Sequence, residues 1–201
     1  MATTHKLTKL SAVNIILSNV GQSPITSLDS ANPLSALAEQ ILDEVSHAFQ
    51  SEGWAFNTEQ DYPFTPDSNK NISIPSNILS LDMLETAPFE TVIRNGKLYD
   101  KRKHTFDFEE TVYLKVVWYF DFVELPEVCK QYIAVRAANL FANRAVGSVE
   151  VVKYSEREEI LARAAVMEYE TQQGDYNIFN DRAGGKEFDS YLPYNAVYRH
   201  F

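Results

Sequence analysis

The sequence has little of what several protein classes need. Cys129 is the single cysteine among 201 residues, which excludes an internal disulfide and a thiol cluster for zinc and fits a reducing compartment. No run of about 18 apolar residues occurs, and the segment from Met1 to Leu10 mixes charged with apolar residues. We therefore expect neither a signal peptide nor membrane insertion, and synthesis in the cytoplasm.

Positive charge is also scarce. The chain has 18 Lys and Arg against 28 Asp and Glu, which gives a formal net charge of -10 at pH 7. Such a charge opposes the counterion release that supplies most of the affinity of conventional nucleic-acid binders. It permits a surface past which DNA slides without being bound. With 45% hydrophobic residues, the chain can still bury a sizeable core.

Motifs for chemistry are missing as well. The four histidines are scattered, with no histidine or cysteine partner at the spacing of metal ligands. Gly184, Gly185 and Lys186 lack the upstream strand, the spaced first glycine and the hydroxyl of a phosphate loop. Paired acids such as Glu109 and Glu110 favour a solvated face over a glycosidase acid and base. We predict no catalytic residue, no cofactor and no metal.

Apolar residues at helical spacing predict two helices near the N-terminus. The first runs from Leu10 to Val20 and stops at Gly21. The second begins with Asn32 as its cap and Pro33 in its first position, and its apolar stripe reaches Phe49 before Gly53.

Two more helices are predicted after the middle of the chain. Pro126 opens the third, which places Cys129 on its apolar face as a small buried hydrophobe, and Gly147 ends it. The fourth follows from Ser148 to about Gly174. It combines a charged face from Glu156 to Glu159 with an apolar stripe of Ile160, Leu161, Ala164 and Met167.

The segment between these pairs of helices has short β-prone runs broken by prolines. Trp54 to Asn57, Ile72 to Ile74 and Thr91 to Tyr99 are predicted as strands and loops, with Asn95 and Gly96 forming a tight hairpin turn. Between Thr111 and Phe120, apolar residues at every second position predict the strongest strand. Both tryptophans, Trp54 and Trp118, are expected to anchor the core.

The order of these elements predicts an α+β fold, in which a helical bundle formed by the N- and C-terminal helices is interrupted by a β-rich insertion. We expect bundle helices in residues 1–53 and 126–174, and the insertion in residues 54–125. Residues 175–201 are expected to form an aromatic docking tail.

Two segments are candidates for binding a partner. The tail has no helical or strand period, yet it is too aromatic for an ordinary solvated tail. Its candidate interface residues are Phe188, Tyr191, Tyr194, Tyr198 and Phe201. The other segment, Lys101, Arg102 and Lys103 with His104, is the one concentrated positive stretch. It would contact DNA phosphates or acidic groups on another subunit, or it is an ordinary solvated turn.

Several segments together resemble the tail tubular protein A family of short-tailed phages, and they occur in the family's order. They are LSAVNIILSNVGQSPITSL (10–28), GWAFN (53–57), LYD (98–100), ELPE (124–127), AANLFANRAVGS (137–148) and MEYETQQGDYNIF (167–179). The residues from Asn180 onward match nothing in the family pattern. The matching pieces have the character of structural rather than catalytic signatures.

The resemblance implies a head-to-tail adaptor without enzymatic activity in the virion tail. It implies a dodecameric ring of this chain between the portal (connector) protein of the capsid and the nozzle protein, tail tubular protein B. Genomic DNA would pass through the centre without sequence-specific binding. A wall-degrading activity has been proposed for relatives, so a peptidoglycan or polysaccharide hydrolase is the alternative. A small binding protein with an incidental likeness is a third interpretation.

Overall fold

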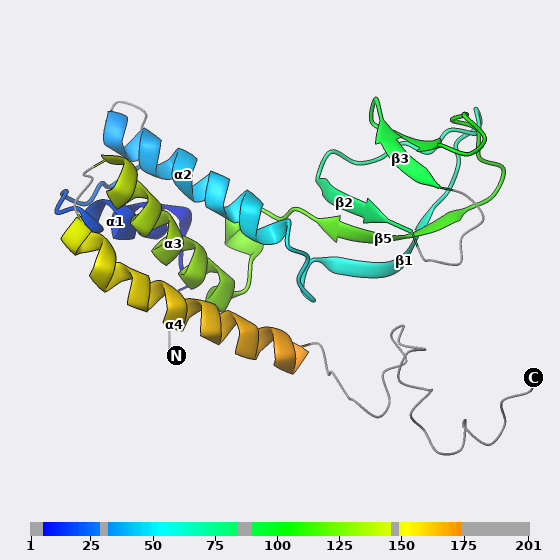
Figure 1. Cartoon of the computed structure of the whole chain (residues 1–201). Coiled ribbons are helices and arrows are strands. Elements are labelled where there is room, and N and C mark those ends of the chain that lie inside the picture. Colours follow the sequence, from blue (N-terminus) through cyan, green and yellow to red (C-terminus); the bar gives the residue numbers. More distant parts are fainter. Residues whose placement is uncertain (1–5, 29–31, 84–89, 146–148, 174–201) are drawn as a thin grey trace, which may run out of the picture.

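The structure is a computed structural model that describes residues 6–28, 32–83, 90–145 and 149–173, with the backbone alone for 149–155. Within these residues, helices gather on one side and strands on the other (Figure 1). The helices are α1 (Lys9–Asn19), α2 (Pro33–Gln50), α3 (Glu127–Ala145) and α4 (Val149–Gln173), with a short 3-10 turn η1 (Phe122–Glu124). The strands are β1 (Thr58–Phe64), β2 (Ile78–Asp82), β3 (Thr91–Arg94), β4 (Lys97–Asp100) and β5 (Val112–Trp118). The predicted mixed α+β class is confirmed.

The starts of α1 and α2 are fixed by side-chain caps. The Thr8 hydroxyl accepts the backbone N–H of Ser11 at 3.1 Å. The Asn32 side chain accepts that of Leu34 at 3.0 Å, and Pro33 occupies the first turn, as the sequence predicted. Each cap satisfies a donor that the helix itself leaves unpaired.

The helical core is built around α3, which packs against α1, α2 and α4. Its buried face includes Cys129, Ile133, Ala137 and Phe141. Because small and large side chains alternate along this face, α1 and α2 can approach α3 closely, and each fully buried Leu or Ile contributes roughly 1.5–3 kcal/mol.

The strands form two antiparallel sheets, one with the order β1-β5-β2 and the other a β3-β4 hairpin. Strand β5 lies in the middle of the larger sheet, and Val112, Leu114 and Val116 are buried while Tyr113 is exposed, as the alternation predicted. The alternation breaks at the end of the strand, where Val117 is also buried and Trp118 is only partly buried. These residues pack with Phe64, Ile72 and Leu98 to form a second core.

The predicted hairpin turn is confirmed at Asn95 and Gly96, which have φ of 52° and 69°. Positive φ at both central residues is what a two-residue hairpin of this hand requires. Two other segments that were predicted as strands and loops form no strand. Trp54 to Asn57 forms a turn, and Ile72 to Ile74 contributes only one isolated bridge.

Buried amides join the helices to the sheet. The Gln50 side chain, 0% exposed, pairs with both backbone groups of Phe120, accepting its N–H at 2.8 Å and donating to its carbonyl at 3.0 Å. The Asn57 side chain donates to the carbonyls of Gln50 and Trp118 at 2.9 and 2.8 Å, and accepts the N–H of Trp54 at 2.8 Å. This Gln50–Asn57 junction fixes the sheet to the end of α2.

Gly53 allows the chain to turn between Gln50 and Asn57. Its φ is 76°, a conformation that costs residues with a Cβ atom energy, and a Cβ there would lie 3.4 Å from the Val117 side chain. Gly53, where the sequence predicted the end of the helix, therefore also lies close to β5.

The N-terminal segment is tied to α3 by a polar contact. The Lys130 side chain is 2% exposed and donates to Glu127 at 2.9 Å. The other carboxylate oxygen of Glu127 accepts the backbone N–H of Leu7 at 2.9 Å. This hydrogen bond, followed by that from Lys130, lowers the pKa of Glu127 below its ordinary value.

Helix α4 packs against α3 through a different face from the apolar one that the sequence predicts to be buried. Among its described side chains only Val166 is fully buried, whereas Ile160 and Leu161 are 68% and 63% exposed. The apolar stripe therefore points away from α3. The expected charged face is partly turned inward instead, because Glu159 accepts hydrogen bonds from Arg136 and Asn139 on α3.

Candidate interaction surfaces

The predicted basic stretch is a tightly closed loop after β4. Asp100 is buried, and its carboxylate accepts the backbone N–H groups of Arg102 at 2.8 Å and Lys103 at 3.1 Å. The N–H of Asp100 donates to the carbonyl of Thr105 at 2.9 Å. The backbone of the loop is thereby fixed while the side chains of residues 101–104 are exposed.

The predicted cations of this loop are not equivalent. Lys101 forms an ion pair with Glu90, and its hydrogen bond lowers the pKa of the Glu90 carboxyl. Lys103 exerts a weaker attraction on Glu109, whose pKa is lowered mainly by the hydrogen bond from Lys70. These contacts are exposed, so salt screens them strongly.

The structure adds two cationic residues that the sequence analysis missed, Arg94 and Lys97. They lie opposite each other in the register of the β3-β4 hairpin. The Arg94 guanidinium lies 4.0 Å from the ring centre of Tyr99, and the Lys97 ammonium donates to Asn71 at 3.3 Å. The available signal was the position of both residues beside Asn95 and Gly96, since a two-residue turn brings its flanking residues together. We call residues 94–104 the basic hairpin.

The other predicted interface residues lie outside the described part of the chain. They are Phe188, Tyr191, Tyr194, Tyr198 and Phe201. The tail that contains them follows α4, which ends at Gln173.

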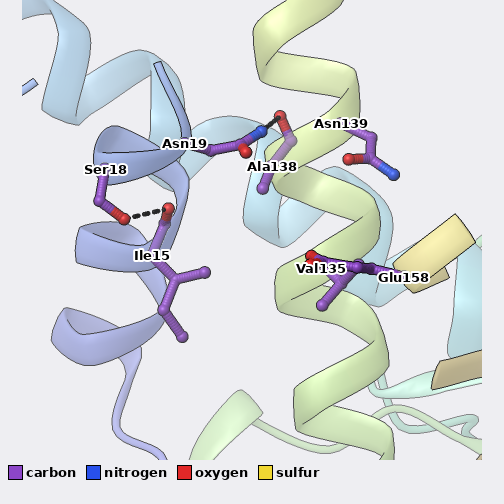
Figure 2. A pocket seen from close by; sticks show the side chains of 7 residues that line it. All are labelled: Ile15, Ser18, Asn19, Val135, Ala138, Asn139 and Glu158. Atoms are coloured by element: carbon purple, nitrogen blue, oxygen red, sulfur yellow. Dashed lines mark hydrogen bonds between the residues drawn. The ribbon is translucent and has the colours of Figure 1, made fainter. Parts of the chain in front are cut away.

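A pocket of about 220 Å³ lies beside α1, α3 and α4 (Figure 2). It is lined by Ile15, Ser18, Asn19, Val135, Ala138, Asn139 and Glu158. Ser18 donates to the Ile15 carbonyl at 2.9 Å and Asn19 to the Ala138 carbonyl at 3.2 Å, so both polar groups serve the helices. Glu158 is the one carboxylate among these lining residues, so this pocket lacks the carboxylate pair of a glycoside hydrolase.

The single cysteine is engaged in packing. Cys129 is buried as predicted, and burial raises the pKa of its thiol to about 12. In the described ranges no group of three or more His, Cys, Asp or Glu is placed to hold a metal ion. Nor does any helix of that part of the chain have the length and apolar character to cross a membrane.

Comparison with known proteins identifies the family. The sequence model of the tail tubular proteins matches residues 10–176, which include every described helix and strand except the first residue of α1. This chain belongs to the tail tubular protein family. It is also 28% identical over 153 residues to tail tubular protein A of Klebsiella phage KP34, covering 75% of this chain and 81% of that protein.

The resemblance found in the sequence is thus confirmed, and this tail tubular protein is a structural component of a phage tail. For such a component the relevant features are the surfaces that meet other tail proteins. Among the described residues, the basic hairpin and the outward face of α4 are two exposed surfaces that are candidates for such contacts.

Proposed function

We propose that this tail tubular protein is a head-to-tail adaptor that forms a ring between the capsid portal and the tail nozzle and surrounds the DNA exit path. The observation that carries the proposal is the family match over residues 10–176, because it covers both the helical and the β parts of the chain. The relative named tail tubular protein A supports it. A dodecamer is the expected ring, and the virion tail is its expected location.

The proposal divides the chain into functional parts. Residues 1–53 and 126–174 form a helical bundle that builds the body of the subunit, and residues 54–125 form a β insertion. Helix α3 packs against α1 and α2. These contacts support the division, because they bring together helices that precede and follow the strands in the sequence. The separate cores of the helices and the sheet support it as well. Residues 175–201 form the docking tail.

The interfaces of the ring follow from its symmetry. A cyclic ring needs two different faces on each subunit, one fitting the other on the next copy. The aromatic tail would anchor the subunit to the portal, because Tyr and Phe side chains dominate interface energetics. The basic hairpin would attract acidic groups of the nozzle protein or of a neighbouring subunit.

The net charge permits passage of DNA without capture. At -10 per subunit the ring repels a polyanion, so DNA does not adhere to the channel. The basic hairpin then serves protein contacts in this proposal, and its alternative contact with DNA phosphates would reveal itself as salt-sensitive DNA binding.

Electron microscopy of the chain alone and mixed with its portal protein tests the proposal. The expected result is a ring that caps the portal, with nozzle protein binding to the capped portal. Bare portals beside unassembled chain would contradict it. Release of dye from labelled peptidoglycan by the purified chain would favour the hydrolase alternative instead.

A further inference from the structure

The outward face of α4 is apolar in its centre and charged at its ends. Ile160 and Leu161 are 68% and 63% exposed, and Ala164 and Ala165 are exposed one turn further along. Arg157 and Glu168 lie on the same side of the helix, one turn before and one turn after this centre. We call these six residues the outer α4 face. Contiguous exposed apolar groups with a polar rim mark interaction sites.

The rotation of α4 about its axis is fixed, so this face cannot turn toward the core. Val166 is buried against the other helices, and Glu159 binds Arg136. The Arg163 guanidinium pairs with Glu52 at 2.5 Å and lies 4.7 Å from the ring of Trp54. These contacts all lie on the inward side, and they hold the outer α4 face toward solvent.

The residues of the face complement a second copy of themselves when the two helices run antiparallel. About a midpoint between Ala162 and Arg163, Ile160 lies beside Ala164 of the second helix and Leu161 lies beside Ala165, because a two-fold axis brings residues of the same flank together. Each large side chain thus meets a small one, which lets helices interdigitate. Arg157 then faces Glu168, so an ion pair closes each end of the contact.

We propose that the outer α4 face is the docking surface for a second copy of this chain, in an antiparallel two-fold dimer. The charges select this occupant. A cation and an anion placed symmetrically about the midpoint match the same helix reversed, whereas a parallel copy would set Arg157 against Arg157 and Glu168 against Glu168. Within the described residues, no other ion pair engages either side chain.

This dimer is distinct from the proposed ring contact and does not depend on it. A two-fold contact uses the same patch on both subunits, so it closes on itself and does not extend into a cyclic ring. The dimer is therefore a form of the free subunit, and it keeps the apolar centre of α4 from water before assembly. Ring formation on the portal would require the pairs to separate.

Sedimentation velocity over a concentration series, with charge-reversal variants, tests the dimer. Wild type is expected to shift from monomer to dimer as concentration rises. Arg157→Glu and Glu168→Arg each place like charges at both ends, so each variant alone should remain monomeric. An equimolar mixture of the two variants restores both ion pairs and should dimerise, as should the double variant.

Glu124→Arg is the matched control, because it makes the same change of charge as Glu168→Arg at an exposed position on η1, outside every proposed contact surface, and should leave dimerisation unchanged. Circular dichroism of each variant should equal that of wild type, which separates loss of the contact from loss of the fold. Wild type that stays monomeric at every concentration overturns the proposal. So does a dimer that survives both single variants, or one that the mixture fails to restore. None of these outcomes bears on whether the chain caps the portal.

Discussion

Single buried polar residues hold segments of the chain together. The sequence contains no pattern that predicts these contacts. Gln50, Asn57, Asp100 and Lys130 are all buried, and each has a hydrogen-bond partner. Gln50 contacts Phe120, which is 70 positions away in the chain. A lone amide on a helix has no periodicity that would point to such a partner, so sequence reasoning could not find these contacts.

The hydrogen bonds of Glu127 should make stability depend on pH. Because its pKa is lower in the folded chain than the ordinary 4.5, its carboxylate stabilises the fold above the unfolded pKa. That stabilisation is lost as pH falls through the lower, folded pKa. Glu127→Gln should therefore lower the free energy of unfolding at neutral pH by about 1 kcal/mol, discounted because the carboxylate is half-exposed.

Urea unfolding of wild type and Glu127→Gln between neutral and acidic pH measures this effect. The difference between the two proteins should shrink as pH falls below the ordinary Glu pKa. Glu124→Gln, at an exposed position on η1, is the control and should stay close to wild type throughout. A difference that grows in acid would contradict the expected direction.

The basic hairpin should carry salt-sensitive contacts. Arg102→Glu with Lys103→Glu should weaken binding of the nozzle protein to the ring, and the weakening should be greatest at low salt because exposed charges are screened. Binding to capped portals at several salt concentrations measures it. Loss of DNA binding with unchanged nozzle binding would assign the loop to phosphate contacts instead.

At the scale of elements, the sequence predicted the helices, strand and turn that are determined by neighbouring residues. Apolar spacing located α1 and α2, the Asn32 cap marked the start of α2, alternation located β5, and Asn95 with Gly96 located the hairpin. Strands β1 and β2 were missed because they are edge strands with irregular burial. Strand β1 has a bulge between Glu59 and Tyr62, with Asp61 at a φ of 54°, and its Pro63 suits only an edge strand.

The orientation of α4 could not be predicted for a different reason. Its most apolar stripe faces outward, and polar groups such as Glu159 and Arg163 bind the rest of the molecule. The prediction that an apolar stripe faces inward assumes that the chain acts as an isolated subunit. That assumption fails for α4 if its outer face binds another copy. The basic hairpin was only half predicted, since Arg94 and Lys97 join it through strand pairing.

The Gln50–Asn57 junction should be the most sensitive connection between elements. Asn57→Ala removes three hydrogen bonds, including the one that the buried Trp54 N–H donates, which should cost about 3 kcal/mol of unfolding free energy. Asn77→Ala, at an exposed position, should change it by less than about 0.5 kcal/mol. Thermal and urea unfolding measure both, and equal effects would mean that the junction adds little.

At the scale of the whole molecule, the helical core and the sheet core form one body through this junction, while the predicted docking tail begins beyond α4. Ending the chain at Gln173 should preserve the helical circular dichroism signal, since the buried residues of both described cores lie at or before Val166. Capping of the portal should be lost. Electron microscopy of portal with full-length and shortened chains measures it.

A variant with serine at Phe188, Tyr191, Tyr194, Tyr198 and Phe201 refines this prediction. It keeps the length of the chain, so a loss of capping equal to that of the truncation would assign attachment to the aromatic side chains. Full capping by either variant would remove the tail from the proposed portal contact.

The isolation of Cys129 has a practical consequence for following assembly in real time. With a pKa of about 12 and almost no exposure, this thiol stays protonated and out of reach of maleimide dyes at neutral pH. A cysteine introduced on the surface would therefore be the single reactive site, without any change to the native core. Fluorophores attached at chosen positions could then report by energy transfer when two subunits approach, separate, and join a portal.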